Sequence, residues 1–204
     1  MKRLTYFLII VLTAFSLQAR NNSAKEITEE GMKYFEARNY REALKLFNKA
    51  IEVDENYDPA YFNRGKVKKI LQDYKGAMLD FNRVIDINSE AHEAYYERGG
   101  VKFEMQDYYG AIADFTKAIE LNPSFVDAYY MRGQAKLELE AYKDAINDCS
   151  RIIEMEPKNP DAYYLRGVLR VEYGQKEDGC LDLSKAGELG DFNVYEVIRE
   201  KCNK

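Results

Sequence analysis

Few side chains in this chain of 204 residues could carry out acid–base or nucleophilic chemistry. His92 is the only histidine, and we expect it to be a solvated residue near the start of a helix. The sequence has no Cys-x-x-Cys pair, no glycine-rich phosphate loop and no serine nucleophile elbow. Its many carboxylates are interpreted as solvated helix faces. We therefore predict that the protein is not an enzyme and has no catalytic residue, no metal site and no cofactor.

Arginine and aspartate form the most regular pattern of charged residues. Four of each recur at the same interval: Arg64, Arg98, Arg132 and Arg166, with Asp80, Asp114, Asp148 and Asp182. Two kinds of chemistry fit this pattern. Each arginine could hold an aspartate in a bidentate ion pair, or the arginines together could bind an acidic ligand. The elements that position these residues decide between the two.

Five glycines set the organisation of the chain. They stand 34 residues apart, at Gly31, Gly65, Gly99, Gly133 and Gly167. Twelve residues after each glycine comes another small residue, namely Ala43, Ala77, Ala111, Ala145 or Gly179. A unit of this size is too small to bury a core alone, so neighbouring units must stack and share one. The spacing predicts an elongated array of repeats that binds other molecules.

The residues between these markers predict helical hairpins. In the third unit, apolar or small residues recur at steps of three and four within 94–105 and again within 109–121. Each unit is therefore expected to hold two antiparallel helices joined by a short turn. Capping patterns predict N-cap residues at Ser23, Asp58, Ser124 and Asn159.

This pattern resembles the tetratricopeptide repeat family, whose unit carries an aromatic at position 4, Gly at 8, Ala at 20, an aromatic at 24, Ala at 27 and Pro at 32. Position 4 is Tyr in four units, and position 24 is Phe47, Phe81, Phe115, Cys149 or Leu183. The resemblance implies an all-α fold, a right-handed α-solenoid of five hairpins plus a capping helix. The repeats would be 24–57, 58–91, 92–125, 126–159 and 160–193, within a domain of 20–193, and the capping helix would be 194–204.

The hairpin arrangement favours ion pairs over an acidic ligand. The arginines occupy position 7 and the aspartates position 23, which lie within about one helical turn of each other when positions 8 and 20 are adjacent. Both partners are missing together from the first unit, where Glu30 and Leu46 replace them. We therefore predict one Arg–Asp pair inside each of the other four repeats.

The resemblance also implies where a partner would bind. In this family, positions 2, 5, 6, 9, 12 and 13 of the first helix line the concave face. The candidates here are Phe62, Tyr96, Tyr130 and Tyr164, the acids Glu97, Glu104, Glu138 and Glu172, and the bases Lys66 and Lys69. Such a groove suits an extended protein or peptide segment with basic and apolar side chains. One alternative is that the rings only pack against neighbouring helices, and another is an envelope assembly subunit that docks through its convex face or ends.

The first nineteen residues predict export to the periplasm or beyond the cell. Lys2 and Arg3 precede an apolar stretch, 4–17, and Ala19 is a small residue at the expected cleavage point. An uncleaved membrane anchor is the alternative, although this stretch is shorter than the roughly 20 residues that span a bilayer. The net charge of −5 becomes −7 without Lys2 and Arg3. A chain this acidic is not expected to bind nucleic acid.

An oxidising compartment would permit a disulfide among the three cysteines. Cys149 stands where other units hold Phe or Leu, so we expect it to be a buried thiol. Cys180 and Cys202 would lie at the same level if the last two helices fold back about Gly190 and Asp191. We predict that these two cysteines form a disulfide that staples the C-terminal cap. The alternative is that both are reduced and buried in the cap interface.

Overall fold

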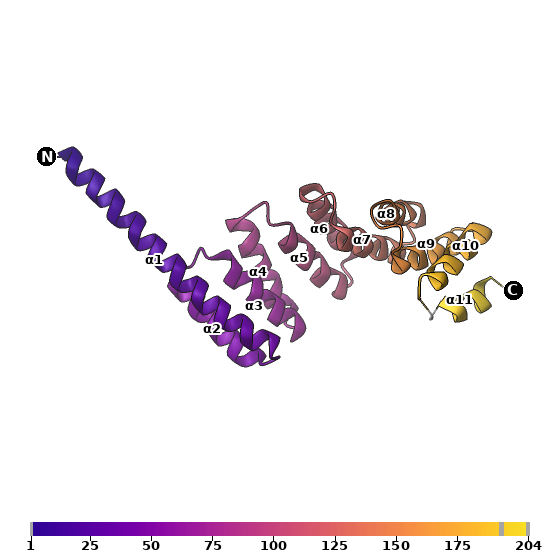
Figure 1. Ribbon diagram of the computed structural model, residues 1–204, viewed down its shortest axis with the longest axis horizontal. Coiled ribbons are helices and arrows are strands. Elements are labelled where there is room, and N and C mark those ends of the chain that lie inside the picture. Colours follow the sequence, from indigo (N-terminus) through magenta and orange to yellow (C-terminus); the bar gives the residue numbers. More distant parts are fainter. Residues whose placement is uncertain (1, 192–193, 203–204) are drawn as a thin grey trace. The chain divides into compact units, whose positions relative to one another are not determined.

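Helices make up nearly all of the described chain (Figure 1). The computed structural model describes the backbone of residues 2–191 and 194–202, and the side chains of this range from residue 19 onward. In chain order the helices are α1 (Lys2–Glu36), α2 (Tyr40–Val53), α3 (Asp58–Ile70), α4 (Tyr74–Ile87), α5 (His92–Glu104), α6 (Tyr108–Leu121), α7 (Val126–Glu138), α8 (Tyr142–Met155), α9 (Pro160–Glu172), α10 (Lys176–Glu188) and α11 (Val194–Lys201). The predicted all-α solenoid of five hairpins plus a C-terminal capping helix is confirmed.

The helices belong to two compact units, Met1–Ala94 and Tyr95–Lys204, whose boundary lies within α5. In unit 1, α1 packs against α2, α3 packs against α4, and α2 also contacts α3. In unit 2, α7 packs against α8, α9 against α10, and α11 against α10. Consecutive helices therefore form the hairpins, and α11 covers the last of them.

The recurring glycines lie where the two helices of a hairpin cross. A Cβ atom on Gly99 would lie 2.8 Å from Phe115 Cε1, closer than real Cβ atoms approach a neighbour. The ring therefore fills the space that a side chain would need, which confirms the predicted steric demand. The fourth hairpin differs, because Cys149 replaces the ring there. A Cβ on Gly133 would have Leu165 Cδ2 as its nearest neighbour, at 3.6 Å.

Each hairpin turn contains one residue in the left-handed region of backbone space. This residue always occupies position 15, and the φ values are 57° at Arg38, 60° at Gln72, 61° at Gln106, 56° at Glu140 and 88° at Gly174. A left-handed residue just past a helix end reverses the chain, and glycine adopts that conformation with the least strain. Only the fifth turn uses a glycine at this position, so the other four carry some strain.

Of the four predicted N-cap residues only Asn159 is confirmed, and the N-cap residue of α7 is Phe125 rather than Ser124. Asn159 caps α9 as predicted, because its Oδ1 accepts a hydrogen bond from the Ala162 amide at 3.0 Å. Asp58 is instead the first residue of α3, and the N-cap residue is Tyr57, which makes no side-chain capping bond. Ser23 lies inside α1, since that helix continues upstream of it. A local capping pattern does not start a helix where the preceding residues are also helical.

The predicted leader lies within α1, which runs without a break through residue 19. The indigo N-terminal part of this helix extends past the end of α2 in Figure 1. Among the described residues, none of the helices combines the length and apolar character needed to cross a membrane. Cleavage after Ala19 stays a prediction. Met1 of the leader and residues 203–204 of the predicted cap lie outside the described residues.

Candidate functional site

A hollow of about 320 Å³ lies between α5, α7 and α9 in unit 2. It is lined by Phe103, Tyr130, Gln134, Leu137, Glu138, Tyr164, Leu165 and Val168, and we call it the unit 2 groove. All eight residues come from the first helix of a hairpin. Its volume is at the lower end of the range of about 300–1,000 Å³ for ligand pockets. The groove therefore suits one or two side chains of a longer segment.

Tyr130 reaches the groove because successive residues of a helix point in different directions. Its neighbour Tyr129 is 9% exposed and belongs to the core, whereas Tyr130 is half-buried and lines the groove. Burial raises the pKa of Tyr130, and the Asp161 carboxylate raises it further. The phenol therefore stays neutral at physiological pH and can both donate and accept a hydrogen bond. Tyr164 lines the groove from the next hairpin and also packs against Leu183.

Tyr96 occupies the same repeat position but does not line the unit 2 groove. Its ring centroid lies 5.8 Å from that of Phe115 and 4.9 Å from that of Phe125. Burial, followed by the charges of Asp127 and Glu97, raises the pKa of Tyr96 to about 12. Tyr96 therefore packs against neighbouring helices, and Tyr130 does so too while it lines the groove.

Of the four predicted acids, only Glu138 lines the groove. Glu172, one repeat later, accepts a hydrogen bond from Lys201 of α11 and forms an ion pair with it. Glu104 is exposed on α5 outside the groove, and Glu97 is partly buried beside Tyr96. The structure thus brings Tyr130, Tyr164 and Glu138 together, and places the other three acids elsewhere.

Unit 1 holds a second hollow, of about 330 Å³, which we call the unit 1 hollow. Its lining is Asp58, Pro59, Phe62, Val84, Asn88, Glu90, Ala91, Glu93 and Ala94. Lys66 lies nearby, with Nζ 5.7 Å from the centroid of the Phe62 ring and 5.4 Å from that of Phe35. Phe62 and Lys66 are therefore close together as expected, whereas Lys69 lies on α3 outside the hollow.

The predicted Arg–Asp pairs are formed in the four expected repeats. In each, the guanidinium donates two hydrogen bonds to one carboxylate, from Nε at 2.8–3.0 Å and from Nη2 at 2.6–2.8 Å. The aspartate side chains are only 4–8% exposed. The pairs are Arg64 with Asp80, Arg98 with Asp114, Arg132 with Asp148, and Arg166 with Asp182. Bidentate geometry at a buried carboxylate gives the arginines a structural role.

A second cation on each aspartate was not predicted from the sequence. These cations lie 2.7–2.8 Å from the carboxylates and are Lys68, Lys102, Lys136 and Arg170. Each follows the pairing arginine by four residues, one helical turn, and this spacing was the available signal. Each pairing arginine also lies over the ring at position 4, with 5.3–5.5 Å from Cζ to the centroid.

Arg64, Arg132 and Arg166 also donate a described hydrogen bond to the preceding repeat. Their Nη1 atoms donate to position 25 of that repeat, which is Asn48, Thr116 or Ser150. One guanidinium thus joins its own hairpin, the tyrosine beneath it and the previous hairpin. With its donors engaged in this way, it is poorly suited to an acidic ligand, which was the alternative interpretation of the arginine series.

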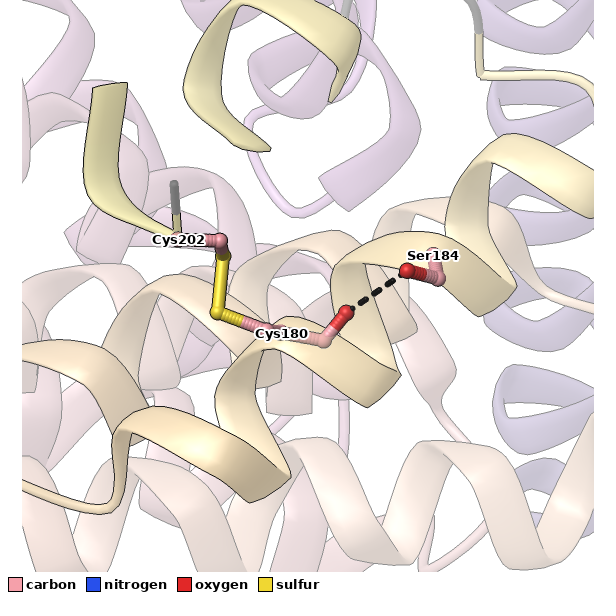
Figure 2. Close-up of a disulfide and its surroundings, with 3 residues drawn as sticks. All are labelled: Cys180, Ser184 and Cys202. Atoms are coloured by element: carbon pink, nitrogen blue, oxygen red, sulfur yellow. Dashed lines mark hydrogen bonds between the residues drawn. A yellow bond between two sulfur atoms is a disulfide. The ribbon is translucent and has the colours of Figure 1, made fainter. Parts of the chain in front are cut away.

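The structure joins Cys180 and Cys202 in a disulfide, as the sequence predicted (Figure 2). The two Cα atoms are 5.9 Å apart, and the bond connects α10 to the end of α11. Figure 2 also shows Ser184, whose hydroxyl donates to the Cys180 carbonyl oxygen at 2.9 Å. Cys149 is a buried free thiol, and burial raises its pKa to about 12. It is therefore protonated and unreactive in the folded state.

The repeat pattern also matches known families. Three models described as tetratricopeptide repeat match residues 28–92, 92–125 and 115–147. This chain is a tetratricopeptide-repeat protein. Such repeats are interaction scaffolds that bind proteins or peptides and are not enzymes. None of the curated proteins compared matches the chain.

Solved structures share its fold at low sequence identity. YrrB, described as having an unusual peptide-binding site, is 22% identical, with a TM-score of 0.74 over 85% of this chain and 90% of YrrB. MamA from Desulfovibrio magneticus is 20% identical, with a TM-score of 0.76 over 81% and 94% of the two chains. PilF of Pseudomonas aeruginosa is 15% identical, with a TM-score of 0.76 over 89% and 86%.

Several groove residues of this tetratricopeptide-repeat protein were missed from the sequence. They are the apolar side chains Phe103, Leu137, Leu165 and Val168, and the amide Gln134. Their repeat positions 6, 9 and 12 were expected to line the inner face, which was the available signal. The prediction selected the aromatic residues of position 5 and charged residues, and so overlooked the apolar and aromatic side chains of positions 6, 9 and 12.

Proposed function

We propose that this tetratricopeptide-repeat protein is an exported scaffold that captures an extended segment of a partner protein in the unit 2 groove. The observation that carries the proposal is the composition of that groove. Leu137, Leu165 and Val168 supply an apolar floor, and two tyrosines lie beside it. The groove therefore provides an apolar surface on which a side chain can bind, and its lining contains no nucleophile or acid–base pair.

The charge of the groove specifies the partner further. Glu138 lines it, and Asp161 is close enough to Tyr130 to raise the pKa of that phenol. No basic residue lines the groove. An apolar side chain would fill the floor, while a neighbouring Lys or Arg would pair with Glu138. The partner segment is therefore one that carries an apolar and a basic residue close together.

Two observations support export as part of the proposal. The N-terminal residues have the charge, apolar stretch and small cleavage residue of a secretory leader. The Cys180–Cys202 disulfide fits an oxidising compartment, because such bonds are rare where thiols are kept reduced. Expression with the leader intact should yield a mature chain that begins at Arg20. N-terminal sequencing that finds Met1 retained on the exported protein would instead support an anchor.

The binding proposal is tested with synthetic decapeptides of alanine and glycine that carry one leucine and one arginine at spacings of one to six residues. At least one spacing should bind, and Glu138→Gln should weaken its binding about fivefold, the equivalent of roughly 1 kcal/mol. Glu104→Gln is the matched control, since it has the same repeat position but lies outside the groove. Fluorescence polarisation measures both. An equal loss of affinity in the two variants, or no binding at any spacing of leucine and arginine, would exclude the unit 2 groove as the binding site.

A second candidate function is assembly through the second helices of the hairpins. Large apolar side chains are exposed there: Tyr109 on α6 at 77%, Leu79 on α4 at 70% and Leu181 on α10 at 70%. Exposed apolar side chains of this size can mark a contact with another protein. If this face binds, Tyr109→Ser and Leu181→Ser should abolish co-purification of the native partner, whereas Glu138→Gln should not.

A further inference from the structure

The 34-residue register continues past the fifth hairpin into α11. Val194 follows Pro160 by one full period, so it takes position 1 of a sixth unit. Ile198 then takes position 5, which is the position of Tyr164 in the fifth repeat. Cys202 takes position 9, that of Val168. By register, α11 corresponds to the first helix of a repeat.

The packing of α11 agrees with this register. Val194 is fully buried with Leu183 and Ala186 of α10. Val197, Ile198 and Cys202 are partly buried against the same cluster, as are Tyr164 and Val168. Tyr164 and Val168 also line the unit 2 groove. The two residues of α9 therefore contact the groove and the cluster that holds α11.

The charge at this end of the protein differs from that at Glu138. Glu172 corresponds to Glu138 by register, but it is paired with Lys201 of α11. Glu138 interacts with the Tyr108 hydroxyl, and none of the described ion pairs involves it. A basic side chain of a partner is therefore attracted to Glu138, whereas the charge of Glu172 is offset by Lys201.

We infer that α11 is the first helix of a sixth repeat and forms the C-terminal wall of the binding groove, where Ile198 contacts an apolar side chain of the bound segment. The Cys180–Cys202 disulfide holds this wall against α10. The inference rests on the proposed function for its ligand. It also gives the bound segment a direction, with its basic residue at Glu138 and an apolar residue towards Ile198.

The disulfide matters because α11 is short. It has eight residues, whereas isolated helices shorter than about 12–15 residues are marginal in water. A dithiol reductant would convert the bond to two cysteine thiols and become a disulfide itself, with two electrons and two protons transferred. Packing of Val194 and its neighbours and the Lys201–Glu172 pair would then still hold α11, but without a covalent link. Reduction therefore opens the wall of the groove.

Hydrogen exchange of the full chain, oxidised and reduced, tests the wall without a ligand. Reduction should accelerate exchange of the α11 amides on the order of 100-fold, as expected for loss of a cross-link over this loop length. Exchange in α9 around Tyr164 should also rise, while α3 and α4 stay unchanged. Cys202→Ser should reproduce the reduced pattern, and Cys149→Ala, which keeps the disulfide, should not. Unchanged exchange in α11, or an effect that does not reach α9, would overturn the inference.

The leucine–arginine decapeptides test the contact made by Ile198. In the oxidised protein, Ile198→Ala should weaken binding of the best decapeptide about fivefold, and Glu196→Ala on the same helix should leave it unchanged. Equal affinities in the wild type and Ile198→Ala would overturn the contact. If no decapeptide binds the wild type, the proposed function fails, and Ile198 is not a peptide contact. The exchange experiment then decides separately whether α11 is coupled to α9.

Discussion

Two glycines at the same repeat position should respond in opposite ways to substitution by alanine. Gly99 and Gly133 are both buried in the first helix of a hairpin, at the crossing with the second helix. An alanine is favoured over glycine inside a helix by about 0.5–1 kcal/mol. The difference between the sites lies in what the added methyl group would meet.

At Gly99 the methyl carbon would lie 2.8 Å from Phe115 Cε1, 2.9 Å from its Cδ1 and 3.2 Å from Asp114 Cβ. Neither neighbour can yield easily, because Phe115 is fully buried and Asp114 is held by two cations. Overpacking of this kind costs about 1–3 kcal/mol. The net effect of Gly99→Ala is therefore a loss of roughly 1–2 kcal/mol of unfolding free energy, after the helix preference is subtracted.

At Gly133 the three nearest atoms would be 3.6–3.8 Å away, which is ordinary van der Waals contact. Gly133→Ala should therefore raise the unfolding free energy by about 0.5–1 kcal/mol, and the melting temperature by about 1–4 °C for a chain of this size. Urea titration followed by circular dichroism measures both variants. As a further control, Phe115→Cys copies the fourth hairpin and should remove most of the penalty of Gly99→Ala. If Gly133→Ala is as destabilising as Gly99→Ala, the steric explanation is refuted.

Three further predictions concern a turn, a buried charge and a thiol. Gln106→Gly should raise the unfolding free energy by about 0.5–1 kcal/mol, because glycine adopts the left-handed conformation at φ 61° with less strain. Gly174→Ala should lower the unfolding free energy for the same reason. Urea titrations in which both substitutions change it in the same direction would contradict this explanation. Asp148→Ala should lower the unfolding free energy by about 3 kcal/mol, since it leaves Arg132 and Lys136 without the carboxylate they share. The triple variant Asp148→Leu, Arg132→Met and Lys136→Met should have a higher melting temperature than Asp148→Ala. Equal melting temperatures would show that the charges are not buried. Cys149 keeps its proton in the folded state up to about pH 12, whereas an unfolded thiol loses it near pH 8.5. Because the pKa is raised in the folded state, the unfolding free energy should fall by about 1.4 kcal/mol per pH unit between these values. In urea titrations above pH 9, Cys149→Val should remove this dependence of the unfolding free energy on pH. An unchanged dependence in Cys149→Val would show that the Cys149 thiol is not its cause.

The Arg–Asp pairs were predictable because both partners share one period and one pair of antiparallel helices. The second cations, such as Lys102, were not, because lysine is common on helix surfaces and its target is known only once side-chain directions are fixed. The turn conformation at Gln106 was equally hidden, since nothing in its residue type favours a left-handed backbone.

The lining of the unit 2 groove was also not predictable from repeat position, because Tyr96 and Tyr130 occupy the same position and only Tyr130 lines the groove. The residue at position 34 separates them. It is Phe125 after the third repeat, where its ring packs against Tyr96, and Asn159 after the fourth, where its side chain caps α9 instead. The surroundings of the two tyrosines therefore differ at a repeat junction, outside the positions that the family pattern describes.

The unequal ends of the repeat array give its unfolding a direction. In a stack of repeats, stability is approximately the sum of each repeat and its contacts with neighbours, so partial unfolding starts at the weaker end. The last hairpin is closed by a covalent bond to α11, whereas the first contains no cysteine and so has no cross-link of this kind. A pulling force or an unfolding machine should therefore meet little resistance at the N-terminal end and strong resistance at the C-terminal end.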